Sequence, residues 1–268
     1  MRMEELRQLA NRLYPKGQCR FVRPGITQAS AFSHAPFSPD GRSVDEIFDD
    51  IRKPGSWVAL YNVEKDARYR EFLAEVQAAF KPLIVREQGR LLDVGGFIFI
   101  SAPPSVTPFH IDRENNFWLQ IHGRKRMTVW DPGPDGVVDI PAVEHFIVTR
   151  DLSQVRFEET MRPLAHEFDT GPGDGVYFPS TSPHMTYSGR DWVAPGDEVC
   201  VSIGVVFYTE LTRRHARVHA FNRMARRVGF SPRPPGESPV RDHAKSLLGG
   251  AMVRARARIG RYALPPGL

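Results

Sequence analysis

The hydrophobic residues of this chain follow one period near its beginning and another in its middle. In residues 3–13 and 67–80 they recur three and four positions apart. Residues at that spacing share one face of a helix, so both segments predict amphipathic helices. We expect the second helix to end before Pro82, because proline lacks the amide hydrogen that a helix interior uses.

Shorter signals fill the rest of the first ninety residues. Ser43 and Glu46 form the sequence pattern of a capping box, which predicts a helix to about Ile51. Residues 56–63 alternate enough to predict a strand. Residues 15–42 contain Gly, Pro and Ser without a sustained period, so we expect a loop there.

From residue 96 the period changes to two, the period of a strand. Gly and Pro turns separate five such segments, which are residues 96–101, 116–122, 124–132, 174–179 and 198–210. Many short strands without helices between them predict an antiparallel sandwich or barrel. Residues 133–170 are expected to form a long insertion between two core strands.

After Tyr208 the pattern becomes helical again, in two segments joined by a Pro-rich linker at 232–239. The first apolar stripe is Leu211, Val218, Phe221, Met224 and Val228, and the second is Ala244, Leu247, Ala251, Ala255, Ile259 and Tyr262. Ser238 and Pro239 are suited to begin the last helix. Both stripes need a surface to pack against. Two possible surfaces remain open, which are the barrel of the same chain and a second copy of the chain in a homodimer.

Charge separates this last region from the rest. The net charge of the 268 residues is +5, but residues 212–268 hold 13 Lys and Arg against Glu237 and Asp242, a balance of +11 that leaves −6 for the remainder. One interpretation is an anionic partner such as nucleic acid. The other is a pair of solvated, Arg-rich helices, which we favour because a charge run alone says little about partners.

Composition narrows the class of protein. A hydrophobic fraction of 41% is typical of a globular protein, and no apolar run is long enough to cross a bilayer. Residues 1–15 lack an apolar signal core. Cys19 and Cys200 are too few for a disulfide scaffold. We therefore expect a cytoplasmic protein without membrane contact.

The candidate chemistry lies in residues 107–126. His110 and Asp112 are two positions apart, so on an extended strand they point to the same face. A third ligand would complete the two-His, one-carboxylate triad of non-haem Fe(II) oxygenases. His184 is the best candidate because it follows a strand that returns to the barrel mouth, and His145 and His166 are its rivals.

This region resembles the JmjC/cupin-like Fe(II)- and 2-oxoglutarate-dependent oxygenases, and most nearly their asparaginyl-hydroxylase type. The resemblance covers roughly residues 90–210 and rests on an ordered set of motif residues. They are Thr107, Pro108, His110, Asp112, Asn116, Phe117, Gln120, Ile121, Gly123, Lys125, Arg126, Gly173, Asp174, Tyr177, Pro179 and His184.

The resemblance implies a fold and a set of roles. The fold is a mainly β, double-stranded β-helix (jelly roll) at 90–210, with residues 1–89 packing on it and basic helices at 211–268. His110, Asp112 and His184 would hold Fe(II), with Glu114 as a fallback ligand. The co-substrate 2-oxoglutarate would be bound by Lys125, Thr107 and Asn116, with Trp118 and Phe99 as pocket walls. The family has an Asn on the last core strand, and Ser202 is its nearest substitute here.

The implied activity is hydroxylation of an unactivated C–H bond with O₂ and 2-oxoglutarate. A peptide or protein side chain is favoured slightly over a free small molecule as the substrate. A second hypothesis is a non-catalytic barrel that binds nucleic acid through its basic helices, but no known nucleic-acid-binding motif supports it. A metal-binding cupin of another reaction class ranks last, because such cupins usually carry an H-x-H pair plus Glu and the second position here is Asp112. A zinc hydrolase with the same three ligands would leave Thr107, Asn116 and Lys125 without a role.

Overall fold

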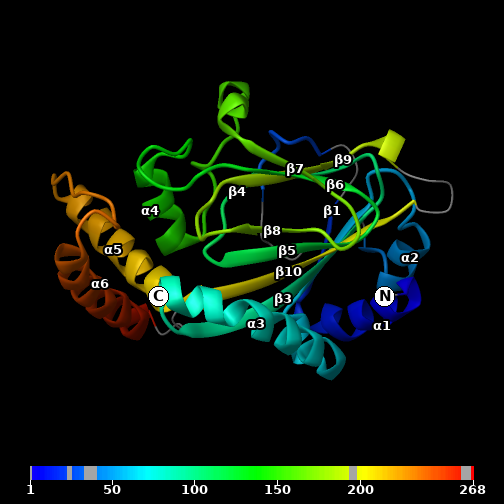
Figure 1. Cartoon of the computed structure of the whole chain (residues 1–268), viewed down its shortest axis with the longest axis horizontal. Coiled ribbons are helices and arrows are strands. Elements are labelled where there is room, and N and C mark those ends of the chain that lie inside the picture. The colour runs from blue at the N-terminus through cyan, green and yellow to red at the C-terminus, as the bar shows by residue number, and fades with distance from the viewer. Residues whose placement is uncertain (1, 23–25, 33–40, 193–197, 261–266) are drawn as a thin grey trace.

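Two antiparallel sheets face each other at the centre of the computed structural model, which describes residues 2–22, 26–32, 41–192, 198–260 and 267–268 (Figure 1). The larger sheet has the order β1 (Cys19–Val22), β2 (Trp57–Tyr61), β3 (Leu91–Ser101), β10 (Cys200–Thr209), β5 (Asn115–His122) and β8 (Gly175–Phe178). The smaller has the order β4 (Ser105–His110), β9 (His184–Ser188), β6 (Lys125–Val129) and β7 (His166–Thr170). The predicted mainly β, double-stranded β-helix core is confirmed.

Helices cover the outer face of the larger sheet. They are α1 (Met3–Leu13), α2 (Val44–Asp49) and α3 (Ala67–Gln88), and α1 and α3 lie beneath the sheet in Figure 1. Along β3, Ile98 and Ile100 face these helices and are completely buried with Leu6 and Leu9 of α1. The alternate residues of β3 therefore face the space between the sheets.

Two expectations for the first ninety residues are wrong. Helix α3 continues through Pro82, because Phe80 and Ile84 on either side of it are buried in the core; Phe80 stacks on Phe117 at 4.4 Å between ring centroids. Packing thus outweighs one missing hydrogen bond. The expected loop at 15–42 contains β1, which pairs with β2.

The expected insertion at 133–170 holds a helix and a strand. Helix α4 (Ile140–Thr149) buries Phe146 and Ile147 against Phe109 and Trp130. The last five residues of the segment form β7, an edge strand of the smaller sheet that pairs with β6. Part of this segment therefore belongs to the barrel itself.

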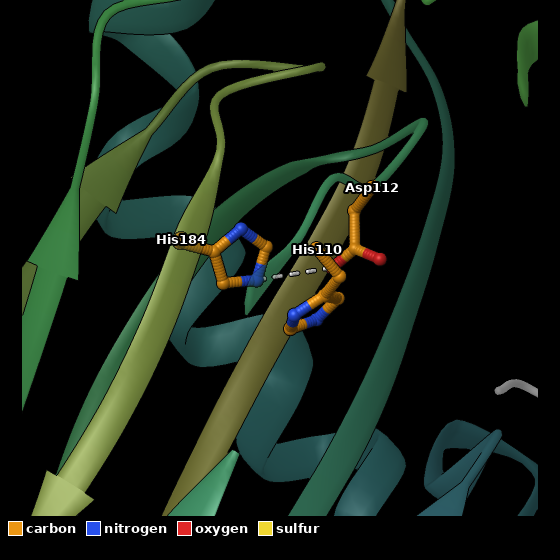
Figure 2. Close-up of side chains that lie close together, drawn as sticks. All are labelled: His110, Asp112 and His184. Carbon is orange, nitrogen blue, oxygen red and sulfur yellow. Dashed lines mark ion pairs between the residues drawn. The ribbon is translucent and has the colours of Figure 1, made fainter. Parts of the chain in front are cut away.

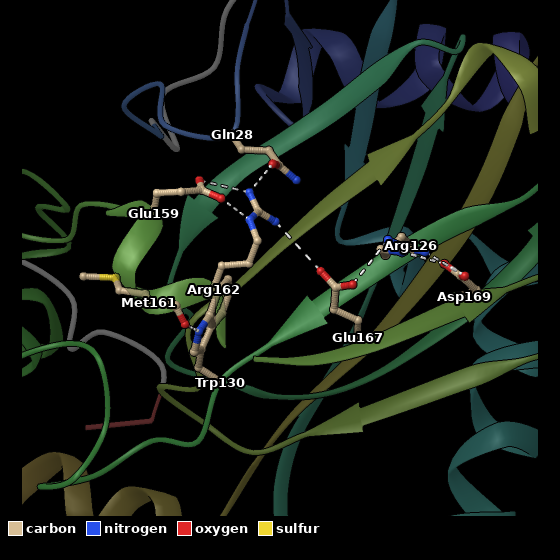
Figure 3. Close-up of polar contacts among 8 residues, drawn as sticks. All are labelled: Gln28, Arg126, Trp130, Glu159, Met161, Arg162, Glu167 and Asp169. Atoms are coloured by element: carbon tan, nitrogen blue, oxygen red, sulfur yellow. Dashed lines mark hydrogen bonds and ion pairs between the residues drawn. The ribbon is translucent and has the colours of Figure 1, made fainter. Parts of the chain in front are cut away.

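A surface network ties this segment to the smaller sheet (Figure 3). Arg126 of β6 binds both carboxylate oxygens of Asp169, at 2.7 and 2.8 Å. Glu167 lies between Arg126 and Arg162, at 3.2 and 3.8 Å, and Arg162 also pairs with Glu159. Single exposed pairs contribute little, but a connected set fixes the position of a loop better than one pair does.

Two further helices follow the last strand, α5 (Glu210–Arg227) and α6 (Pro239–Gly260), and they lie side by side at one end of the molecule (Figure 1). Arg226 of α5 contacts the buried Glu144 of α4 at 2.9 Å, so α5 docks on the barrel region. Helix α6 packs on α5 through Gly249, where a Cβ would lie 2.1 Å from the Arg217 carbonyl oxygen. None of the described helices is long and apolar enough to cross a membrane.

The close packing at Gly249 turns the predicted apolar stripe of α6 toward solvent. Leu247 is 61% exposed and Ile259 is 86% exposed, and Ala244, Ala251 and Ala255 are exposed as well. Tyr262, the last member of the stripe, lies outside the described residues. Docking within one chain thus accounts for Val218 of the α5 stripe and for the small residues of α6. Met224 and Val228 of the α5 stripe are exposed, and the α6 stripe has no partner among the described residues.

We expect a second copy of the chain to cover this stripe. A Leu247→Glu/Ala251→Glu variant should then sediment as a monomer where the parent sediments as a dimer, because it places charges in the apolar contact. The matched control is Leu164→Glu, which changes an equally exposed leucine far from α6. A parent that is monomeric at micromolar concentrations would contradict the prediction.

A buried histidine of α5 links folding to pH. His219 is 6% exposed, and burial lowers its pKa from 6.5 to about 3. Below pH 6.5 the unfolded chain binds a proton at this position while the native chain does not. The stability contributed by neutral His219 is therefore complete above pH 6.5 and is lost progressively as the pH falls toward 3.

We predict that His219→Gln, which cannot take up a proton, flattens the acid limb of the stability curve. Between pH 6.5 and 4 the free energy of unfolding of the parent should fall more steeply than that of the variant, by up to about 1.4 kcal/mol per pH unit. Urea unfolding at several pH values measures this difference. The exposed His243→Gln is the control and should follow the parent.

Candidate metal centre

Three side chains predicted as ligands come together at one end of the smaller sheet (Figure 2). His110 is the last residue of β4, His184 is the first of β9, and the two residues pair in the β4–β9 ladder. Asp112 follows just beyond β4, and its Oδ2 lies 3.5 Å from Nε2 of His184. One ligand atom from each residue lies within 4.8 Å of the other two.

The rival histidines lie elsewhere. His145 on α4 contacts Asp151 at 3.0 Å, and His166 on β7 is exposed and contacts Asp131 at 3.4 Å. Among the described residues, only the group of His110, Asp112 and His184 brings three potential ligands to one point. The choice of His184 from the sequence agrees with this geometry.

Backbone carbonyls set the orientation of both imidazoles. Nδ1 of His110 is 2.8 Å from the Pro108 carbonyl oxygen, and Nδ1 of His184 is 3.0 Å from that of Ser182. A carbonyl only accepts, so each Nδ1 carries the proton and donates it. Nε2 is then the nitrogen of each ring that is able to coordinate a metal.

The turn before β9 holds the two metal-binding segments together. Thr181, with a φ of +65°, donates its amide hydrogen to the Asp112 carbonyl at 2.8 Å. The Ser180 hydroxyl donates to the Arg113 carbonyl at 2.7 Å. The chain that leads into His184 is thus hydrogen-bonded directly to the chain that follows His110, which holds the two ligand-bearing segments in register.

Aromatic rings lie against both imidazoles. Phe32 stacks on His110 at 3.9 Å between centroids with planes 5° apart, and Phe178 lies 4.5 Å from His184. The Arg20 guanidinium lies over the Phe32 ring, 4.5 Å from its centroid. Arg20 and Phe32 were missed in the sequence because both lie in the segment expected to be a loop.

Glu114, the fallback ligand, lies outside the triad. Its Oε1 accepts a hydrogen bond of 2.5 Å from the Tyr208 hydroxyl. Burial, and then the negative charge of Asp112, raise the pKa of Glu114. It borders a pocket of about 500 Å³ that leads to His110 and Asp112. Aromatic rings make up much of the pocket wall, from Phe32, Tyr61, Phe97, Phe99 and Phe146.

A buried cation lies between the sheets. Lys125 of β6 is 2% exposed, and burial lowers its pKa. It forms no ion pair with any carboxylate in the part of the chain that the structure describes. Because an unpaired buried charge is costly, this position suits an anionic ligand. Lys125 lies two residues from the buried Met127, so both side chains share one face of β6.

Polar groups accompany Lys125 on the strands around it. The Thr186 hydroxyl donates to that of Thr107 at 2.9 Å, which joins β9 to β4. Asn116 of β5 is 3% exposed, and its amide oxygen has no hydrogen-bond partner among the described residues. A Cβ at Gly204 would lie 3.2 Å from that oxygen, so the glycine leaves room beside it.

Three further residues were predicted around the co-substrate, namely Trp118, Phe99 and Ser202. Trp118 is 3% exposed and packs with Met127, Val129, Val176 and Phe178, and Phe99 is packed against this cluster. The Ser202 hydroxyl donates to the Gln120 side-chain oxygen at 2.7 Å, so its proton is already engaged.

These residues fit the two groups that the resemblance implies, Fe(II) and 2-oxoglutarate. Two imidazoles and one carboxylate leave three positions of an octahedral ion open on one face, a donor set suited to Fe(II). An unpaired lysine with polar neighbours suits the distal carboxylate of a dicarboxylic acid.

Comparisons with solved structures give low similarity. The ribosomal oxygenase YcfD from Escherichia coli is 20% identical with a TM-score of 0.46, over 94% of this chain and 58% of that chain. The values are the same for the YcfD complex with cobalt and 2-oxoglutarate. The polyketide cyclase RemF from Streptomyces resistomycificus is 14% identical with a TM-score of 0.25, over 42% of this chain and 54% of that one. At these scores the matches do not bear on the reaction.

No curated protein matches the sequence. The family model for the JmjC domain does match, over residues 75–209. This stretch contains every strand from β3 to β10 and all three residues of the candidate metal centre. Since the match extends over half of the sequence, the chain belongs to the JmjC domain family.

Proposed function

We propose that this protein is an Fe(II)- and 2-oxoglutarate-dependent oxygenase that hydroxylates an unactivated C–H bond. The observation that carries the proposal is the combination of the cluster of His110, Asp112 and His184 with an unpaired, buried Lys125. A metal protein of another class would need the three ligands but not the buried cation. A dicarboxylate co-substrate requires both the metal ligands and the buried cation.

The residues divide into two groups with different roles. Nε2 of His110, Nε2 of His184 and a carboxylate oxygen of Asp112 would hold Fe(II), and the carbonyls of Pro108 and Ser182 keep both rings in the required tautomer. When bound, the iron with 2-oxoglutarate and O₂ supplies the oxidising power for hydroxylation. The protein contributes position, orientation and exclusion of water.

Lys125 would bind the distal carboxylate of 2-oxoglutarate, with Thr107 and Asn116 as hydrogen-bond partners. The Thr107 oxygen accepts from Thr186, which leaves its own hydrogen available to donate. Ser202 is less able to donate a hydrogen bond to the co-substrate than the sequence suggested, because its hydroxyl already donates to Gln120. Trp118 and Phe99 would form the apolar wall beside the co-substrate.

The substrate would enter through the aromatic pocket that opens onto His110 and Asp112. The motif resemblance to asparaginyl hydroxylases favours a peptide or protein side chain, and a free small molecule is the alternative. We also propose residues 90–210 as the catalytic unit, 1–89 as its cover and 211–268 as an appended helical region, in a cytoplasmic protein.

The metal centre is tested by removing its ligands one at a time. His110→Ala, Asp112→Ala and His184→Ala should each lose iron, because two ligands rarely hold Fe(II) against water. Metal analysis after anaerobic loading gives the iron content, and circular dichroism verifies folding. His145→Ala and His166→Ala are controls that should keep the parent content. Iron retained in His184→Ala but lost in one of the controls would identify His145 or His166, rather than His184, as the third ligand.

The co-substrate site is tested through Lys125. Lys125→Ala should keep iron but require much more 2-oxoglutarate, since losing one partner of a buried charge pair typically costs about 3–5 kcal/mol, or roughly a hundredfold or more in affinity. Titration of the anaerobic Fe(II) protein, followed by its visible charge-transfer band, measures this. Arg126→Ala, which removes an exposed partner of Asp169, is the matched control. Superimposable curves for Lys125→Ala and the parent would refute 2-oxoglutarate binding at this position.

A further inference from the structure

A buried arginine lies beside the candidate metal centre without a carboxylate partner. Arg113 directly follows the candidate ligand Asp112, and it is 6% exposed. Its Nε and Nη1 atoms form no hydrogen bond with any described residue, and it forms no ion pair in the part of the chain that the structure describes. Burying a charged group without a partner is costly, so the position of Arg113 needs an explanation.

Helix α4 explains one part of this side chain. Nη2 of Arg113 donates to the carbonyl oxygens of Phe146 and Ile147 in the last turn of α4, at 3.3 Å for Phe146. The end of a helix carries only about half a negative elementary charge, so it does not neutralise a guanidinium group. A structural role in holding α4 therefore accounts for Nη2, and it leaves Nε and Nη1 unused.

The same arginine lines the pocket through which the substrate is proposed to enter. This pocket has a volume of about 500 Å³, and His110, Asp112, Glu114 and Arg150 also line it. Consecutive Cα atoms are about 3.8 Å apart, so a group that Arg113 binds in this pocket lies close to Asp112 and to the metal centre. Such a group would lie near the attacked C–H bond.

A second arginine adds positive charge to the same pocket. Arg150 is the residue at which α4 ends, and its exposed side chain lines the pocket together with Arg113. After burial, the charge of Arg150 is the next cause that lowers the pKa of Arg113, so the two guanidinium groups lie near each other. An anion bound in the pocket would offset this repulsion.

The two acids of the pocket are engaged elsewhere. Asp112 belongs to the candidate metal centre. The Glu114 carboxylate accepts a hydrogen bond of 2.5 Å from the Tyr208 hydroxyl, and among the described residues it forms no ion pair with Arg113 or Arg150. Neither acid is the partner that Arg113 lacks, which leaves a ligand as the source of that partner.

We propose that the substrate carries a carboxylate, which Arg113 binds beside the metal centre with Arg150 as an outer cation. This inference rests on the oxygenase function proposed above and names the chemistry of its substrate. Guanidinium N–H groups match the oxygens of a carboxylate in charge and in geometry. A dianion such as phosphate fits less well, because Asp112 and Glu114 in the same pocket would repel it more strongly.

The experiment compares a central Asp with a central Asn, which have nearly the same shape and differ in charge. Fluorescein-labelled peptide pools, with mixed neutral residues around one or the other, are titrated with the anaerobic Fe(II) protein and followed by anisotropy. Saturating 2-oxoglutarate occupies the Lys125 site, so the peptides are kept from it. The N-acetyl amides of Asp and Asn serve as unlabelled competitors that represent a free small molecule.

Four variants divide the contributions. Arg113→Gln removes the buried charge, Arg113→Lys keeps it, and Arg150→Gln removes the outer charge. The matched control is Arg156→Gln, which removes the same charge from an exposed arginine that does not line the pocket. Iron content and the charge-transfer band with 2-oxoglutarate verify that each variant is folded around its metal centre.

The parent should bind the Asp pool about tenfold or more tightly than the Asn pool. Arg113→Gln should lose this preference, and Arg113→Lys should retain part of it. Arg150→Gln should reduce it by about two- to fivefold, since an exposed charge contributes less. Arg156→Gln should behave as the parent. Stronger competition by unlabelled Asp peptides than by the Asp amide indicates a peptide as the source of the carboxylate, equal competition indicates a free acid, and both support the proposal.

Five results would overturn the proposal. They are no binding of the Asp pool at millimolar concentration, equal binding of both pools by the parent, a preference for Asp that survives in Arg113→Gln, tighter binding of a pool with a central phosphoserine, and loss of the 2-oxoglutarate band in Arg113→Gln. The last result would assign this arginine to the co-substrate. A parent that gives no band with 2-oxoglutarate contradicts the proposed function instead, so the two failures are distinguishable.

Discussion

The pairing of β4 with β9 is the constraint on which the site depends. It places His110 opposite His184, although the two lie far apart in the sequence, and Val129 of β6 pairs with His184 from the other side. A shift of this register by one residue would turn one histidine to the outer face of the sheet. The bonds from the 179–183 turn to the chain after β4 secure the same alignment. The ligand geometry is therefore a property of the folded barrel, which is what preorganisation of a metal site requires.

The barrel strands and the candidate ligands could be predicted because both follow simple rules of position. Strand residues alternate between two faces, so a polar residue at an inward position, such as Lys125 or Asn116, is conspicuous in the sequence. His110 and Asp112 are conspicuous for the same reason. His184 was separable from His145 and His166 because it follows a strand, β8, that was expected to return the chain to the barrel mouth.

The remaining features depend on contacts that no local pattern encodes. Cys19, Arg20 and Phe21 of β1 are all buried, so the strand shows no alternation, and Phe32 reaches His110 from an irregular segment. In α6 the period of the hydrophobic residues predicted a helix, but the face that packs on α5 is not the apolar stripe. Two adjacent glycines allow a closer approach to α5 than leucines would, so the small residues meet the neighbour and the leucines do not.

The position of β7 at the edge of the smaller sheet has a consequence for how the molecule behaves in concentrated solution. An edge strand offers unpaired backbone groups to any strand of another molecule, which is a common route to aggregation. The sequence of β7, HEFDT, places Glu167 and Asp169 on this edge, and the arginines of the network hold both carboxylates in place. A second copy of β7 approaching in antiparallel register would meet acids with acids. This edge therefore resists growth of the sheet from one molecule to the next.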